Sequence, residues 1–380
     1  MKRLLLILAS AVLAVNGVFA QANPNIPTKL FSGPWKAGHV QGVAVDTKQE
    51  YIYLSFTTML VKMDMKGNVV GTVTGLLGHL GCIEFNEADG RVYGSLEYKD
   101  DSIGRSILNR EGVSGTLQTG FYVAIFDVNK INREGMSAER DGVMTSVLLK
   151  TVVEDYSATV KDANGNELKH RHGCSGFDGI SFGPAFDGSG KTMLTIAYGI
   201  YRGKNRSDND YQVLLQYDTT DWKQYEQPLS QNNMHNQGPE KPYGKYFVRT
   251  GNTSWGVQNM EYDKASNLWF LACYPGKKDT FANYTLFAID GAKLPVKKKL
   301  VGVKYVKKAN VLTLAKVGSK DDQNSDIYGW YNKLGVYGMH SFGGGDFYLV
   351  SAGKTEEGRT AKLHRARYVG TDSKAFELVE

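Results

Sequence analysis

The fold is decided by GHVQGVAVD (residues 38–46) and by the three segments that follow it, YIYLSFT (51–57), MLVKMDM (59–65) and NVVGTVTG (68–75). Each segment has the length and apolar content of a β-strand, and the turns between them are short. The same unit returns as GHLGCIEFN (78–86), RVYGSLEY (91–98), FYVAIFDV (121–128) and VMTSVLLK (143–150). A four-strand unit repeated along the chain is typical of a β-propeller.

Three further copies carry the repeat to the C-terminal end, beginning with CSGFDGISF (174–182), SWGVQNMEYD (254–263) and GMHSFGGGDFYLVSAG (338–353). The outer strand is expected after Trp222 in the third copy, and in either KKLVGVKYV (298–306) or ANVLTLAKV (309–317) in the fourth. The repeat predicts one all-β propeller of five blades, each with four antiparallel strands. A degenerate blade within residues 291–330 would make six.

Two segments outside the repeat have expected places in this fold. TKLFSG (28–33) is expected to pair with the last blade, because joining the two ends of the chain closes the ring and removes exposed sheet edges. Residues 156–171 alternate around Asn164-Gly165, which predicts a hairpin. This hairpin is expected to lie over the face of the ring as a lid.

The N-terminal run MKRLLLILASAVLAVNGVFA has the pattern of a secretory signal peptide, with a basic start and a short apolar core. We therefore expect a signal peptide at residues 1–20, cleaved near Ala20, and a propeller domain at 21–380. The apolar core is too short for a committed membrane span, and no second one follows. The expected location is the periplasm or the extracellular space.

Three cysteines, Cys82, Cys174 and Cys273, are an odd number for an exported chain. Cys82 and Cys174 open equivalent strands and could bridge neighbouring blades, whereas all three could instead be buried thiols that pack as small apolar groups. The spacing leaves both alternatives open.

Chemistry is expected where loops lead into the innermost strands, because propellers bind ligands on that face around the central channel. Four of the seven histidines fall in these loops, together with polar and aromatic neighbours. The candidates from this set are His39, Gln41, His79, His172, Trp255, Gln258, Asn259 and His340. Each histidine could instead fill the channel mouth and bond to a neighbouring blade.

The loops between the second and third strands open on the same face. They supply tyrosines beside cationic residues, namely Tyr98, Arg105, Tyr201, Arg202, Arg206 and Lys354. Imidazoles surrounded by Tyr, Arg and Lys suit an acidic oligosaccharide or polysaccharide, since guanidinium binds carboxylate bidentately and aromatic faces stack on sugar rings. The net charge of +6 is too mild to indicate nucleic-acid binding.

This inventory fits a polysaccharide lyase better than a hydrolase. β-Elimination at a uronate needs a cation on the carboxylate, a base such as His or Tyr for the neighbouring C–H, and a proton for the departing oxygen. We therefore take His39, His79, His172, Tyr98 and Tyr201 as catalytic candidates and the other residues as substrate-binding. A two-carboxylate hydrolase needs a facing pair, and Glu97, Asp178 and Glu261 form none that the sequence makes obvious.

Residues 38–105, from GHVQGVAVD to SIGR, resemble a family of secreted propeller lyases from gut bacteria and fungi that cleave rhamnose from glucuronate at the ends of arabinogalactan chains. The resemblance implies seven blades. It also implies that His39 and His79 transfer protons and that Arg105 or Arg202 holds the carboxylate.

Two alternatives remain beside the lyase. One is a non-catalytic propeller that binds glycan or protein, because the fold itself implies no activity. The other is a sialidase-like or lactonase-like hydrolase. The sequence requires no cofactor; a structural calcium ion at the central channel is an expectation without a diagnostic ligand spacing.

Overall fold

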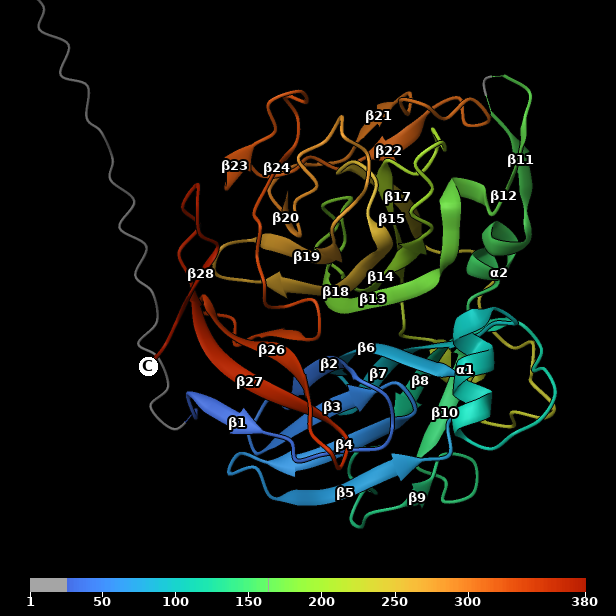
Figure 1. The fold of residues 1–380 in the computed structure, drawn as a ribbon, viewed down its shortest axis with the longest axis vertical. Helices are drawn as coiled ribbons and strands as arrows, with labels where there is room; N and C mark the ends of the chain where they lie inside the picture. Colours follow the sequence, from blue (N-terminus) through green and yellow to red (C-terminus); the bar gives the residue numbers. More distant parts are fainter. Residues whose placement is uncertain (1–25, 163) are drawn as a thin grey trace, which may run out of the picture.

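Five β-sheets are arranged radially in the computed structural model, which describes residues 26–162 and 164–380 (Figure 1). Their innermost strands are β2 (Val40–Val45), β6 (His79–Asn86), β13 (Cys174–Pro184), β18 (Ser254–Asp263) and β25 (Met339–Ser341). Each of these strands contacts the next, and β25 contacts β2, so the ring is closed. The predicted five-bladed propeller is confirmed, and six- and seven-bladed rings are wrong. The predicted signal peptide lies outside the described residues.

Each blade grows outward from its innermost strand by antiparallel pairing, except at parallel outer strands in the first and third blades. The first blade adds β3 (Tyr51–Phe56), β4 (Met59–Asp64), β5 (Val69–Thr74) and a short parallel β9 (Met136–Ser137). The second adds β7 (Arg91–Tyr98), β8 (Gly120–Phe126), β10 (Met144–Leu148) and β16 (Gln227–Pro228). The third adds β14 (Thr192–Ile200), β15 (Tyr211–Tyr217), β17 (Gly244–Arg249), β22 (Ala309–Val311) and β21 (Val296–Lys298).

The fourth and fifth blades are smaller. The fourth consists of β18, β19 (Leu268–Tyr274) and β20 (Leu286–Asp290). The fifth adds to β25 the strands β26 (Asp346–Lys354), β27 (Arg359–Tyr368), β28 (Phe376–Leu378) and β1 (Lys29–Phe31). Two short hairpins lie outside the blades, β11 (Thr159–Lys161) with β12 (Glu167–Lys169) and β23 (Ser319–Lys320) with β24 (Tyr328–Gly329).

Apolar packing between the blades explains why the strands read as nearly continuous apolar runs. Both faces of a blade are covered by its neighbours, so alternation with polar residues is lost. Each blade contributes a large aromatic side chain that is at most 2% exposed, namely Tyr53, Tyr93, Phe177, Trp269 and Tyr348. Burial of such rings is a main source of stability in an all-β core.

Ring closure follows the prediction for residues 28–33. Strand β1 pairs antiparallel with β27, with Leu30 opposite Leu363, and Trp35 bridges to Arg359. Strand β28 pairs with the other end of β27. The first and last strands of the described chain thus both add to β27, and the ring is held by hydrogen bonds between sequence-distant segments.

The outer edge of the fourth blade is partly as predicted. Residues 309–317 pair with β17 through β22 and then run to β20, where the Asp290 N–H donates to the Thr313 carbonyl at 2.9 Å. The alternative at 298–306 is wrong, because residues 299–306 form no strand and Lys298 ends β21, which pairs with β22 in the third sheet. Residues 291–330 therefore extend existing blades and form no sixth one.

Two short helices, α1 (Ser102–Arg110) and α2 (Lys150–Ser157), were not expected. Helix α1 begins because the Asp101 side chain accepts hydrogen bonds from the N–H groups of Ile103 and Gly104, and it buries Ile107 and Leu108. None of the helices in the described chain is long and apolar enough to cross a membrane.

The cysteine and lid predictions are also decided by the structure. Cys82, Cys174 and Cys273 are buried and free, so a bridge between the first two is wrong and the buried-thiol alternative is confirmed. The β11–β12 hairpin forms as predicted, but it projects at the edge of the third blade beside α2 (Figure 1) and does not cover the channel mouth. The lid prediction is therefore wrong.

Candidate functional site

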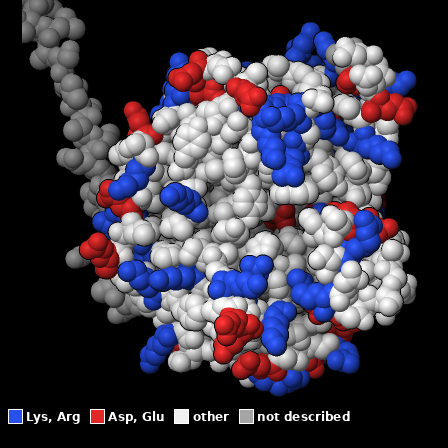
Figure 2. All heavy atoms as spheres, viewed as in Figure 1, with Lys and Arg blue, Asp and Glu red and all other residues white. Residues whose placement is uncertain are grey.

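A pocket of about 1170 Å³ opens where the innermost strands begin. Its lining includes seven of the fourteen predicted site residues, namely His39, Gln41, His79, Arg202, Trp255, Gln258 and Lys354. It also includes Glu97 and Asp178, two of the acids that the sequence offered without an obvious pair. Figure 2 shows Lys and Arg side chains distributed around the hollow centre of the face that is drawn. The predicted location of the site is therefore a real concavity.

The floor of the pocket is built around the Gln41 amide. Its nitrogen lies 3.1 Å from Nε2 of His39, 3.0 Å from Nε2 of His79 and 3.2 Å from Oγ1 of Thr57. Gln41 belongs to β2 and His79 begins β6, so the contact joins two blades. Two imidazoles thus converge on one amide at the channel mouth.

Glycines in the motifs GHVQG and GHLG allow the innermost strands to come this close. A Cβ on Gly42 would lie 2.8 Å from the Ile83 nitrogen, and one on Gly81 would lie 2.4 Å from Oγ of Ser95. Both glycines sit at register irregularities of the strand pairing. The bulges turn the preceding histidines toward the mouth, which is a common use of bulges near sites.

Both imidazoles are neutral at neutral pH. Burial lowers the pKa of His39 to about 4, with a further contribution from His79 beside it. Burial likewise lowers the pKa of His79 to about 4. A neutral imidazole has one nitrogen able to accept a proton, so the pair has the state that a base requires.

Two carboxylates and a lysine lie behind His79. Oδ1 of Asp178 is 3.4 Å from Nδ1 of His79, and Oδ2 accepts a hydrogen bond from the Gln258 amide at 3.1 Å. Lys99 Nζ pairs with Oε2 of Glu97 at 2.7 Å and donates to the Ser175 carbonyl. The ligand atoms of His79, Glu97 and Asp178 lie within 4.8 Å of one another.

Burial dominates the titration of these acids. It raises the pKa of Glu97 to about 7 and that of Asp178 to about 6, although Lys99 opposes both shifts. The sequence offered these acids without a facing pair because their proximity depends on the contact between β6, β7 and β13. An acid placed behind an imidazole orients the ring and stabilises its protonated form.

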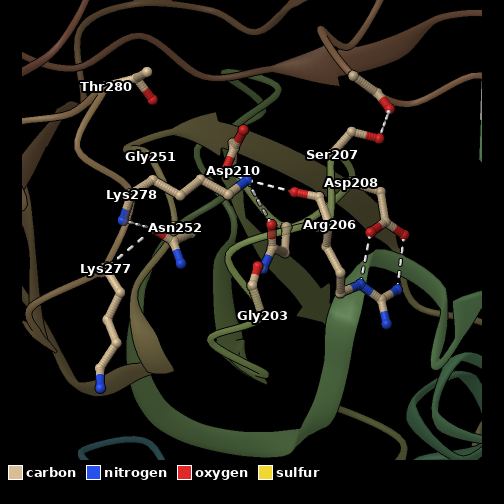
Figure 3. A network of polar contacts seen from close by, with 12 residues as sticks. Gly203, Arg206, Ser207, Asp208, Asp210, Gly251, Asn252, Lys277, Lys278 and Thr280 are labelled. Atoms are coloured by element: carbon tan, nitrogen blue, oxygen red, sulfur yellow. Dashed lines mark hydrogen bonds and ion pairs between the residues drawn. The ribbon is translucent and has the colours of Figure 1, made fainter.

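The rim of the pocket is cationic. Its Lys and Arg side chains are Lys36, Arg110, Arg202, Lys277, Lys354 and Arg359. Figure 3 shows how the loop that contains Arg206, which follows Arg202, is linked to the loop that contains Lys277. Lys278 Nζ donates to the Asn209 side chain at 2.9 Å and to the Arg206 carbonyl, while the Asn252 side chain accepts from the Lys277 N–H (Figure 3).

Trp255 is held at the rim by a strained backbone. Its φ is +68°, and Gly256 follows with a φ of +73° at a bulge in β18. A bulky residue in this region is an outlier that needs support from its surroundings, and such outliers gather at functional sites. The half-buried indole is available as a stacking surface in the pocket.

Seven predicted residues do not line this pocket, and His340 and His172 are two of them. His340 lies in β25 near Glu84 and Glu261, at the opposite end of the channel, because this innermost strand is short and Tyr337 takes the position at the mouth. His172 has a φ of +59° and turns outward, where it contacts Tyr305 and lines a second pocket of about 470 Å³.

Four others have structural contacts instead. Tyr98 is 1% exposed and donates to the Gln231 side chain, and Tyr201 packs behind Trp255. Arg206 pairs with Asp208 (Figure 3), and Asn259 donates to the carbonyls of Gln41 and Val336 across the channel.

A seventh, Arg105, sits on α1 and pairs with Asp100 at 2.7 Å, with more than half of its side chain exposed. It does not line the mouth pocket, whereas Ser102, Ile103 and Ser106 of the same helix do. These α1 residues, with Tyr337 near His39, are a part of the site that sequence reasoning missed. The cap at Asp101 and the apolar spacing Ile103–Ile107 were the available signals for α1.

Comparisons with known proteins give distant similarity in structure alone. No family model and no curated protein matches the chain. Among solved structures it is similar to the soluble aldose sugar dehydrogenase of Escherichia coli (10% identity, 86% of this chain and 96% of that chain, TM-score 0.33). It is also similar to the PQQ domain of pyranose dehydrogenase from Coprinopsis cinerea (10%, 85% and 81%, 0.33) and to a Bacteroides caccae protein of unknown function (10%, 73% and 86%, 0.29). Similarity at this level carries no information on substrate or chemistry.

Proposed function

We propose that the mouth pocket binds an acidic glycan and cleaves it by β-elimination at a uronate. The observation that carries the proposal is the pair of neutral imidazoles, His39 and His79, meeting at Gln41 beneath a rim of Lys and Arg side chains. An anionic sugar needs the rim, and elimination needs a base beside it. The uronate cap implied by the family resemblance is the substrate to test first.

Each step of the elimination is assigned to residues of the pocket. Arg202 or Arg359 binds the uronate carboxylate, which makes the neighbouring C–H more acidic, and Trp255 stacks on the sugar. His79, with Asp178 behind it, removes the proton. As the C–H electrons form the double bond, the bond to the leaving oxygen breaks, and that oxygen takes a proton from the pocket, where His39 is the nearest shuttle.

The decisive experiment is incubation of the protein with uronate-capped glycans while ultraviolet absorbance is followed, since elimination leaves a conjugated double bond. Substrates whose carboxyl groups have been reduced are the control. A rise with the acidic glycan alone supports the lyase. New sugar ends without absorbance would indicate hydrolysis, and neither signal with measurable binding would indicate a binder.

One observation favours non-catalytic glycan binding as the second candidate. The Gln41 amide contacts Nε2 of both histidines, so the nitrogen that a base would use is already engaged in this arrangement. Catalysis requires the ligand to displace that amide. A binder requires no such step, and the same rim would hold the glycan.

Replacement of Arg202 with alanine is expected to weaken binding of an acidic glycan by about tenfold, because one hydrogen-bonded charge contact is lost. Isothermal titration at two salt concentrations measures the change, and the variant should show the weaker salt dependence. Arg105→Ala is the matched control: it removes an arginine on the same face that lies outside the pocket. Equal losses in both variants would contradict the assignment.

The pH dependence of elimination is expected to report Asp178. Its pKa is raised to about 6, so the carboxylate behind His79 is lost as the pH falls through this value and the rate should fall with it. In Asp178→Asn the acid limb should move toward pH 4, where burial places the pKa of His79. Measurement of kcat/KM against pH tests this, and an unmoved limb would refute the role of Asp178.

A further inference from the structure

A second group of ligand-type side chains lies at the end of the channel opposite the mouth pocket. Carboxylate oxygens of Glu84 and Glu261 and a ring nitrogen of His340 are within 4.8 Å of one another. Glu84 is five residues beyond His79 in β6, and Glu261 is six beyond Trp255 in β18. At about 3.3 Å per strand residue, the cluster is well separated from the mouth.

This cluster is buried and lacks a balancing cation. Glu84 is 7% exposed and Glu261 is 4% exposed. Within the described residues, the ion-pair partner found for these carboxylates is His340 alone, at 4.0 Å from Glu84. By contrast, Glu97 in the mouth cluster is already paired with Lys99. Two carboxylates this close cannot both ionise in a buried place without a positive charge between them.

Two atoms of the cluster have no hydrogen-bond partner within the described residues. Oε2 of Glu261 and Nδ1 of His340 are both buried and unpartnered within the described chain. Backbone N–H groups hold one oxygen of each carboxylate. The Ser341 N–H donates to Oε1 of Glu261 at 2.8 Å, and the Phe85 N–H donates to Oε1 of Glu84 at 2.9 Å. The Glu261 carboxylate is therefore held by the backbone on Oε1, and its Oε2 is available, as is Nδ1 of His340.

We propose that Glu84, Glu261 and His340 bind a divalent transition metal ion of the zinc class. One imidazole with two carboxylates is a donor set that Zn²⁺ accepts, with water completing the coordination. Calcium takes oxygen ligands and larger coordination numbers, which this set does not supply. The ion proposed for the channel is therefore smaller than the calcium ion expected from the sequence and has a nitrogen ligand.

The ligands come from the second, fourth and fifth blades, so the ion would join blades across the channel. Its role would be to stabilise the ring, and it lies apart from the proposed glycan pocket. Failure of the glycan proposal would leave this one intact. Binding to the folded state raises the melting temperature as the concentration of the metal increases.

The test is titration of metal-stripped protein with ZnCl₂, followed by calorimetry, and with CoCl₂, followed by visible absorption. The expected result is one Zn²⁺ per chain and a higher melting temperature, with at least about tenfold weaker binding in Glu261→Gln and in His340→Gln. Because Glu261→Gln is nearly isosteric, circular dichroism should show an intact fold; Glu84→Gln is the substitute if it does not.

Two variants serve as controls. Asp178→Asn alters the mouth cluster and His364→Gln removes a histidine from the outer part of the fifth blade, and both should keep wild-type zinc affinity. The proposal is overturned if wild-type protein binds no zinc, if the channel-end variants bind it as tightly as wild type, or if Asp178→Asn alone loses it. Tight calcium binding that His340→Gln leaves unchanged would also overturn it.

Discussion

Replacing His79 with alanine is expected to lower the rate of glycan elimination about a thousandfold, since a positioned general base contributes on this order. The imidazole is neutral at neutral pH and has Asp178 at Nδ1, so its Nε2 is the nitrogen directed to the pocket. Among the described residues of the pocket floor, no other imidazole has a carboxylate at its Nδ1. The rate with saturating uronate-capped glycan is the quantity to measure.

The control for His79→Ala is His364→Ala, which removes a histidine far from the mouth pocket and should leave the rate unchanged. His39→Ala should also lower the rate strongly, because the two rings meet at the same amide. Near-ultraviolet circular dichroism should be unchanged in all three variants. If His79→Ala keeps the full rate and the fold, this histidine has no part in the mechanism.

The position of the site was predictable because it depends on local motifs. In GHVQG and GHLG the histidine precedes a glycine-bearing bulge at the start of an innermost strand, so fold and site come from the same residues. Trp255 and Gln258 were found for the same reason, at the start of β18. Strand repeats also located the ring closure, since β1 needs an unpaired edge and β27 provides one.

The fifth blade shows where strand patterns fail. Its innermost strand, β25, contains three residues. An error of that length in placing the strand moves a side chain from one end of the channel to the other. His340 was therefore expected at the mouth and lies with Glu84 instead. The prediction for His172 was wrong because of its backbone conformation. Its φ of +59° directs the imidazole away from the central channel, and the sequence does not predict such an angle for a histidine.

The proximity of Glu97 and Asp178 could not be predicted from the sequence, because the two carboxylates meet only through tertiary packing. Glu97 comes from β7 and Asp178 from β13, and the glycine at position 176 makes room for the former. A Cβ at Gly176 would overlap Oε1 of Glu97, and its φ of +119° also requires glycine. This close fit is invisible until neighbouring blades are placed together.

Replacing Lys99 with methionine is expected to lower the free energy of unfolding by about 3–5 kcal/mol, the usual cost of leaving a buried charge without its partner. Lys99 and Glu97 have side-chain exposures of 7% and 3%, and their charged atoms are 2.7 Å apart. Lys99 also donates to the Ser175 carbonyl at the start of β13, so its loss removes a link between the second and third blades. Urea unfolding at neutral pH measures the change.

Rescue of this variant separates charge from packing. The double variant Glu97→Gln with Lys99→Met removes both charges and keeps the side-chain volumes, so it should recover at least half of the lost stability. Lys277→Met, on the exposed rim of the same pocket, should change the unfolding free energy by less than about 0.5 kcal/mol. A Lys99→Met effect as small as that of Lys277→Met would mean that Glu97 is protonated in the folded protein. This outcome is physically coherent, because burial raises the pKa of Glu97 to about 7, and it would remove the ion pair from the description of the floor.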